Sequence, residues 1–139
     1  MKKTRMRVPS GAIRRTGEAR RFRLWVMMRG VIGMITVNLY YQGSGGSALA
    51  FAREMESSGI AAEIRAEKGN LRYQYFQPLD DPETVLLIDS WTDQAAIDAH
   101  HASPMMARLA ALRKKYDLHM TVERFVDEAP GADEKYIRK

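Results

Sequence analysis

The sequence of 139 residues contains no cysteine, and this absence removes several kinds of chemistry. Disulfides, thiolate nucleophiles and cysteine-ligated metal centres all require that side chain. The sequence also lacks an apolar segment long enough to span a bilayer, because the apolar run at residues 24–28 is short and bracketed by arginines. We therefore expect a cytoplasmic protein that does not enter membranes and whose chemistry comes from other side chains.

Acidic residues are almost missing from the first 33 positions. Residues 1–33 hold ten Lys and Arg residues against the single acid Glu18, whereas residues 34–139 hold twelve against sixteen acids. The basic excess therefore lies in a segment with turn residues and no clean helical or strand period, and the remainder is mildly acidic. We expect no nucleic-acid binding, and we interpret residues 1–33 as a disordered extension or as the product of an upstream in-frame start placed before Met34.

The remaining residues are enough for one domain, which we place at 34–127, followed by a polar tail at 128–139. Alternating apolar residues predict strands at 35–41, 70–77, 84–91 and 118–126. Helical spacing predicts a long helix that is capped by Ser47, bent or broken at Gly59 and stopped by Gly69. A short helix to His101 and another capped by Ser103 follow the third strand. The order β-α-β-β-α-β predicts an α+β protein with the ferredoxin-like arrangement.

The third predicted strand is apolar on both of its faces, since residues 85–88 read Val-Leu-Leu-Ile. An antiparallel strand needs this pattern only where both faces of the sheet are covered. The helices can cover one face, and in a chain of this size a second copy of the sheet is the economical cover for the other. We therefore predict a homodimer.

Two adjacent histidines, His100 and His101, end the helix predicted after the third strand. Neighbouring side chains on a helix point about 100° apart, so these two cannot hold one metal ion together. His100 shares a face with Ala96, and we expect it to point inward, where a carboxylate or a backbone carbonyl would ordinarily satisfy it. Further ligands such as Asp98 or His119 stand at no recognised spacing, and we expect no metal. No serine lies in a nucleophile-elbow setting.

Other polar and aromatic residues fall at the ends of the predicted strands. Trp91 ends the third strand, where an indole either closes the core or walls a pocket, and Tyr73 is equally suited to packing. Asn38 lies within an apolar strand, and a buried amide must line a cavity or bond a neighbour. Arg72 is either a solvated residue or an anion anchor, and the sequence leaves both open.

Three segments, residues 67–73, 89–91 and 99–104, resemble the antibiotic biosynthesis monooxygenase superfamily, in particular its small quinol monooxygenase members. The resemblance covers about residues 34–127. It implies a dimeric α+β barrel that oxidises a small aromatic substrate, a phenol or quinol, with O₂ and without metal, flavin or haem. It also implies catalytic roles for five residues. His100 would be a base or hydrogen-bond donor oriented by Asp89. Trp91 and Tyr73 would be ring walls of the pocket, and Asn38 would be a polar anchor.

The chain departs from the family pattern at several positions. Relatives commonly have histidine where this chain has Met105, and often glutamate where it has Asp89. Haem-degrading members have their axial histidine where this chain has Ala110, so we expect no haem. Two alternatives remain: an isomerase of a small carbonyl compound, favoured by a small polar cavity with Arg72 pointing inward, and a non-catalytic dimeric ligand-binding module, favoured by a pocket filled with its own side chains. A ring-lined apolar pocket of roughly a few hundred Å³ would favour the oxygenase.

Overall fold

The computed structural model describes residues 33–128 and 131–139. The predicted basic extension at residues 1–33 therefore lies outside the described residues, apart from Gly33. In the polar tail at 128–139, residues Gly131–Tyr136 form a 3₁₀ helix, η1, in which no side chain is buried. None of the helices in the described ranges has both the length and the hydropathy that crossing a bilayer requires.

The element order matches the prediction, with each helical region divided into two helices. The elements before η1 are β1 (Ile35–Gln42), α2 (Ser47–Ser57), α3 (Ile60–Arg65), β2 (Asn70–Phe76), β3 (Thr84–Trp91), α4 (Gln94–His101), α5 (Met105–Lys115) and β4 (His119–Val126). The strands form one antiparallel sheet in the order β2-β3-β1-β4. This is the ferredoxin-like α+β fold.

Local sequence explains where the helices begin and end. Gly59 separates α2 from α3 because it adopts a left-handed conformation with φ of 84°. Asp93 caps α4, since its carboxylate accepts a hydrogen bond of 2.8 Å from the backbone N–H of Ala96. The predicted serine caps are wrong: Ser47 lies inside α2 and accepts from the N–H of Ser44, outside the helix, and the Ser103 side chain makes no cap bond to α5.

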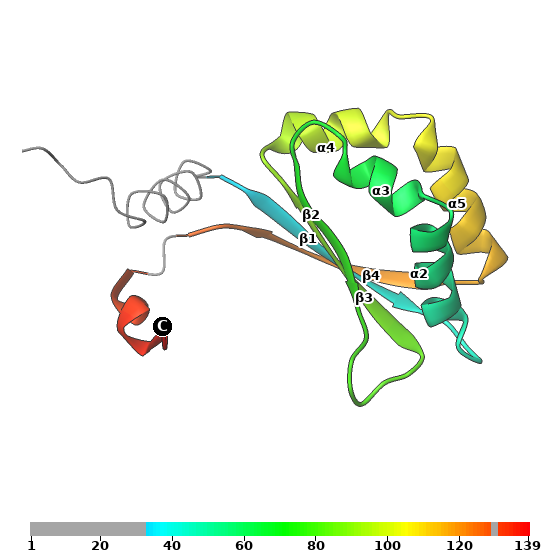
Figure 1. The fold of residues 1–139 in the computed structure, drawn as a ribbon, viewed down its shortest axis with the longest axis horizontal. Coiled ribbons are helices and arrows are strands. Elements are labelled where there is room, and N and C mark those ends of the chain that lie inside the picture. Colours follow the sequence, from blue (N-terminus) through cyan, green and yellow to red (C-terminus); the bar gives the residue numbers. More distant parts are fainter. Residues whose placement is uncertain (1–32, 129–130) are drawn as a thin grey trace, which may run out of the picture. The chain divides into compact units, whose positions relative to one another are not determined.

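The register of the sheet assigns each strand residue to one of two faces. Val37 of β1 pairs with Asp89 of β3 and with Arg124 of β4, and these residues share the face toward the helices. The helices α2, α3, α4 and α5 all lie on that side of the sheet (Figure 1). The opposite side of the sheet, here called the open face, has no helix of residues 33–128 upon it (Figure 1).

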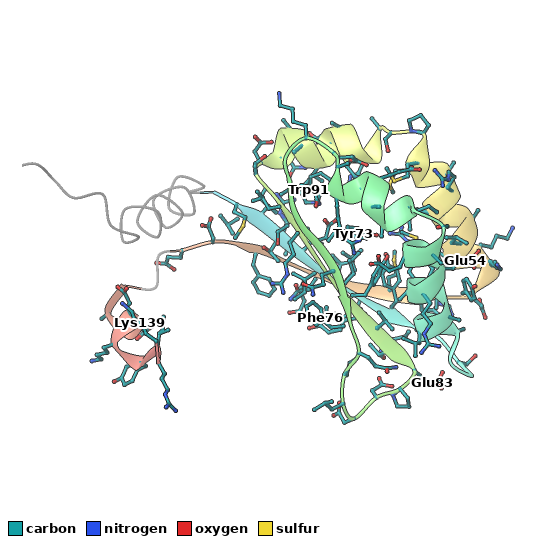
Figure 2. All side chains as sticks on the ribbon, viewed as in Figure 1. Glu54, Tyr73, Phe76, Glu83, Trp91 and Lys139 are labelled. Carbon is teal, nitrogen blue, oxygen red and sulfur yellow. The ribbon has the colours of Figure 1, made fainter. Side chains whose placement is uncertain are left out.

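The hydrophobic core lies between the sheet and the helices. Its largest fully buried side chains come from both layers: Trp91, Tyr41, Phe51, Met55, Ile64, Leu87, Leu109 and Val85. Phe51 of α2 contacts Tyr41 of β1 with ring centroids 4.9 Å apart, and such pairs add to the stability from area burial. Figure 2 shows Tyr73 and Trp91 between sheet and helices, with Phe76 on the other side.

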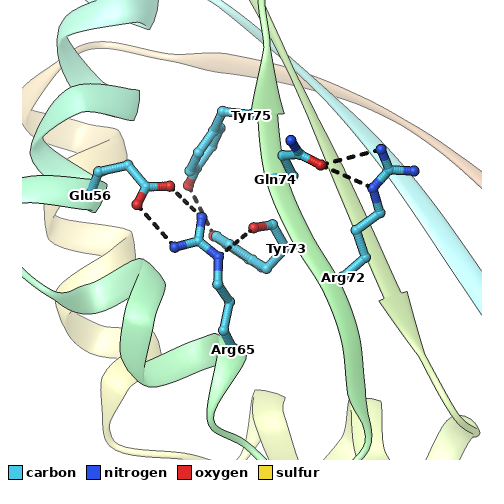
Figure 3. Close-up of polar contacts among 6 residues, drawn as sticks. All are labelled: Glu56, Arg65, Arg72, Tyr73, Gln74 and Tyr75. Atoms are coloured by element: carbon cyan, nitrogen blue, oxygen red, sulfur yellow. Dashed lines mark hydrogen bonds and ion pairs between the residues drawn. The ribbon is translucent and has the colours of Figure 1, made fainter.

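Strand β2 shows the division between the two faces in detail (Figure 3). Tyr73 and Tyr75 point toward the helices, and their hydroxyl oxygens lie 3.0 Å apart. Arg65 at the end of α3 donates to the Tyr73 carbonyl oxygen at 2.8 Å, which fixes the helix to the strand. Arg72 and Gln74 lie on the open face, where the Arg72 guanidinium donates to the Gln74 side-chain oxygen at 3.2 and 3.3 Å.

Candidate active site

A pocket of about 340 Å³ lies between the helix-facing side of the sheet and helices α4 and α5. Apolar and aromatic residues form most of its wall: Val37, Leu39, Tyr73, Leu87, Trp91, Ile97, Met106, Leu109, Met120 and Val122. The polar lining residues are Asp89, Gln94, His100, His101, Arg113 and Arg124. A pocket of this size and lining suits a ligand with one or two rings.

His100 places a buried imidazole in the wall of this pocket. It lies in the last turn of α4, is only 4% exposed, and its Nδ1 atom is 3.0 and 3.1 Å from the two carboxylate oxygens of Glu67. Its ring also packs on Trp91, with centroids 4.9 Å apart. A carboxylate beside Nδ1 favours the tautomer that carries its proton there, which leaves the Nε2 lone pair as the proton acceptor.

Asp89 lines the same pocket from β3 and is 8% exposed. Its Oδ1 accepts a hydrogen bond of 3.2 Å from the Asn70 side chain. Burial raises the pKa of Asp89 to about 6, although the Trp91 side chain and His100 both act to lower it. The structure gives His100 a different hydrogen-bonding partner, Glu67, so the expected orientation of His100 by Asp89 is wrong.

Tyr73 belongs to the same wall and is 2% exposed. Burial is the main cause that raises the pKa of Tyr73, and also that of Tyr75, above the ordinary tyrosine value. Both side chains are therefore neutral hydroxyls at physiological pH. They can donate or accept hydrogen bonds, but they cannot serve as anionic bases.

Asn38 lies on the open face, away from the pocket. It pairs in register with Ile88 of β3 and Glu123 of β4, whereas the helix-facing residues of β1 are its neighbours Val37 and Leu39. Its side-chain oxygen is buried and has no hydrogen-bond partner among the described residues. The structure thus brings four of the five predicted site residues together, His100, Trp91, Tyr73 and Asp89, and separates Asn38 from them.

The sequence and the fold resemble those of known proteins. The sequence profile described as "Antibiotic biosynthesis monooxygenase" matches residues 34–112. The protein belongs to the antibiotic biosynthesis monooxygenase family. In Bacillus subtilis (strain 168), the protein named "Putative monooxygenase YcnE" is 30% identical over 46 residues, which are 33% of this chain and 48% of that protein. The match thus spans about half the length of this curated relative.

Solved structures share the fold of this family member at low sequence identity. SnoaB, described as a cofactor-independent oxygenase from Streptomyces nogalater, is 16% identical with a TM-score of 0.60, over 72% of this chain and 98% of that one. PA3566 from Pseudomonas aeruginosa is 24% identical with a TM-score of 0.60, over 70% and 96%. A conserved protein from Methanosarcina mazei Go1 is 20% identical with a TM-score of 0.63, over 73% and 99%. These likenesses support the fold assignment.

The site of this antibiotic biosynthesis monooxygenase family protein contains two residues to which the sequence patterns assigned no role. Glu67 lies in the turn between α3 and β2, and Arg113 lies near the end of α5. Glu67 reaches His100 across 33 residues of sequence, and no helix or strand period relates the two. A signal for Arg113 was present, because it stands four residues after the buried Leu109 and therefore on the same helix face.

A second hollow, of about 510 Å³, lies between α3 and the start of α5. Its lining includes Glu63, Lys68 and Arg108 but not Trp91 or His100, and an ion pair of 2.9 Å joins Arg108 to Glu63. Although this hollow is larger, it contains no buried base, and we regard the 340 Å³ pocket as the candidate active site. Within residues 33–128 and 131–139, no three His, Asp or Glu side chains are arranged to hold a metal ion.

Proposed function

We propose that this protein is a cofactor-independent monooxygenase that oxidises a quinol or a related polyphenol with O₂. The observation that carries the proposal is a buried imidazole, His100, held by Glu67 and packed on Trp91 in the wall of an apolar pocket. In the proposed reaction one oxygen atom enters the substrate ring, the other leaves as water, and the quinol becomes a hydroxylated quinone. Oxygen is reduced and the substrate is oxidised, so no other reductant is needed.

The proposed role of His100 follows from its hydrogen bonds. Its Nε2 atom accepts the phenolic proton, and the Glu67 carboxylate at Nδ1 stabilises the imidazolium that forms. The resulting electron-rich anion can pass an electron to O₂ without help from a metal or flavin. The apolar wall and the indole of Trp91 exclude water from this anion and from the oxygenated product that precedes the quinone.

The size and lining of the pocket support this proposal over the two alternatives. The description of SnoaB as a cofactor-independent oxygenase supports it at the level of fold likeness. Arg72, which an isomerase pocket would turn inward, lies on the open face and is bound to Gln74. A pocket of about 340 Å³ is also not filled by its own side chains, which weakens the case for a non-catalytic module.

Oxygen uptake by the wild-type protein tests the proposal. Protein treated with chelator and freed of flavin would be mixed with a panel of substituted hydroquinones while dissolved oxygen and quinone absorbance are followed. We expect uptake with at least one member of the panel, with one O₂ consumed for each hydroxylated quinone formed. Uptake that disappears after chelator treatment, or the absence of uptake throughout the panel, would contradict the proposal.

Replacing Glu67 with glutamine is expected to lower the rate of oxygen uptake by roughly 10- to 100-fold, because an amide cannot neutralise the imidazolium formed at His100. The measurement is kcat/KM at several pH values, beside Glu63→Gln as the matched control. Glu63 pairs with Arg108 and makes no contact with His100. If Glu67→Gln and Glu63→Gln had the same activity, Glu67 would have no part in the reaction.

We also propose that the open face is covered by a second copy of the chain. The open face carries a mixture of apolar, aromatic and polar side chains: Thr36, Asn38, Tyr40, Arg72, Gln74, Phe76, Leu86, Ile88, Ser90, Thr121, Glu123 and Phe125. Phe76 and Phe125 are 36% and 51% exposed there. The buried side-chain oxygen of Asn38 lacks a partner among the described residues, and a facing subunit could supply the donor.

The substitution Ile88→Asp is expected to convert the dimer to a monomer, because it introduces a charge at the centre of the proposed interface. Sedimentation velocity of the wild type and the variant would measure this. Leu79→Asp is the matched control, since Leu79 is a fully exposed leucine in the loop between β2 and β3. A monomeric wild type, or an Ile88→Asp variant that stays dimeric, would contradict the proposed interface.

A further inference from the structure

Arg113 contributes a positive charge to the pocket without an acidic partner among the described residues. Its Nη2 atom donates to the hydroxyl oxygen of Tyr41 at 2.8 Å, and its guanidinium carbon lies 5.4 Å from the centroid of the Tyr41 ring. Its Nε atom is buried and has no hydrogen-bond partner in the described part of the chain. Arg113 therefore has an N–H group without an acceptor among these residues, at Nε, and its side chain lines the pocket.

The ion pairs among the described residues involve other cations. Arg65 pairs with Glu56, Arg108 with Glu63 and Lys115 with Glu54, in each case on the protein surface. Arg113 has no carboxylate oxygen within ion-pair distance among the described residues. Arg113 is partly buried, and a charge with reduced access to water that lacks a counter-ion or a full set of hydrogen bonds destabilises the folded protein.

The remaining charged and titratable groups of the pocket are bonded to a neighbour or, like His101 and Arg124, exposed. Asp89 accepts from the Asn70 side chain and His100 contacts Glu67. Arg124 of β4 donates to the Gln94 side chain at 2.6 Å. Arg113 is thus the partly buried cation of the pocket without an acidic partner among the described residues. The fork of its guanidinium suits a planar oxyanion such as a carboxylate.

We propose that Arg113 binds an anionic group of the ligand, so that the preferred substrates are hydroquinones that carry a carboxylate or a comparable acidic substituent. That the ligand is a substrate rests on the proposed function, whereas the binding of an anion by Arg113 does not depend on any reaction. With the acidic group on Arg113, the ring lies against the apolar wall of the pocket that Arg113 shares with His100.

Calorimetric binding of two redox-inert ligands tests the proposal without turnover. The ligands are 4-hydroxybenzoate and 4-hydroxybenzamide, which have nearly the same shape but differ in charge. The wild type is expected to bind the carboxylate more tightly by roughly 10- to 100-fold, as a charge-assisted hydrogen bond in a pocket implies. Arg113→Gln is expected to bring that ratio close to one, and Arg113→Lys to keep part of it because the charge remains.

Arg108→Gln is the matched control, because Arg108 pairs with Glu63 outside the pocket, and its ratio is expected to equal that of the wild type. A wild type that binds neither ligand, or that binds both equally, overturns the proposal, as does an Arg113→Gln variant that keeps the wild-type ratio. If Arg113→Gln does not fold, the wild-type and Arg113→Lys ratios decide the question. A preserved carboxylate preference in a protein that takes up no oxygen would refute the oxygenase and leave the anion site standing.

Discussion

Oxygen uptake by the His100→Ala variant is expected to be lower than that of the wild type by about 10²- to 10⁴-fold, which is the usual contribution of a positioned general base. The imidazole is 4% exposed and held by both oxygens of Glu67, so neither water nor a neighbouring side chain replaces it readily. Because the base acts on the phenolic proton, the loss is expected in kcat more than in KM. The measurement is the initial rate of oxygen consumption over a range of substrate concentrations.

Removing a buried ring also leaves a cavity beside Trp91, so loss of activity must be separated from loss of folding. His100→Gln, which fills more of the space, provides the second variant, and thermal unfolding of each variant provides the check. His119→Ala is the matched histidine control, since His119 is exposed at the start of β4 and does not line the pocket. A folded His100→Ala protein with wild-type kcat would exclude His100 as the base.

Asp89 is expected to make the stability of the wild-type protein decrease as pH rises through the weakly acidic range. Burial raises the pKa of Asp89 to about 6, so the folded protein holds this proton more tightly than the unfolded chain does. Between the unfolded pKa, about 4, and the folded pKa, the folded state carries more protons, and the free energy of unfolding falls with rising pH. Above this window the destabilisation is complete, at about 3 kcal/mol.

The Asp89→Asn variant is therefore expected to be more stable than the wild type near pH 8, by about 1–3 kcal/mol, because the amide carries no charge to desolvate. The advantage is expected to shrink as the pH falls toward the unfolded pKa of about 4, and to vanish below it, where the aspartate is protonated in both states. Urea unfolding of both proteins at pH 4.5, 6 and 8 measures this, with Asp98→Asn, an exposed change on α4, as the control. Equal stabilities of wild type and Asp89→Asn at every pH would contradict the buried, proton-binding environment of Asp89.

Much of the fold could be predicted because its signals are local. Two-residue alternation marks the strands, helical spacing marks the helices, and Gly59 marks the break between α2 and α3 through its left-handed conformation. The caps were less predictable. Ser47 and Ser103 are favourable cap residues in isolation, yet α2 already begins at Ser47, with Gly46 at the cap position, and α5 begins only at Met105, after Pro104.

Predicting which residues form the site required information on tertiary contacts that local sequence patterns do not carry. His100, Trp91, Tyr73 and Asp89, which line one pocket, were predicted together from their places at the ends of elements and from the family resemblance. Asn38 was grouped with them although strand alternation and sheet register put it on the opposite face. The partners of other site residues depend on tertiary contacts. Glu67 meets His100 through the packing of a turn on α4. Arg113 shares a helix face with Leu109, but the sequence does not show that its partner is Tyr41.

The ionisation of a bound phenol in the absence of oxygen tests the central claim most directly, because it isolates proton transfer to His100 from every later step. A chromogenic phenol such as 4-nitrophenol would be titrated with wild-type and His100→Ala protein under argon, and its phenolate absorbance followed against pH. We expect the phenol bound to the wild type to ionise at a lower pH than the phenol bound to His100→Ala. Identical ionisation curves for phenol bound to the two proteins would contradict the assignment of His100 as the base.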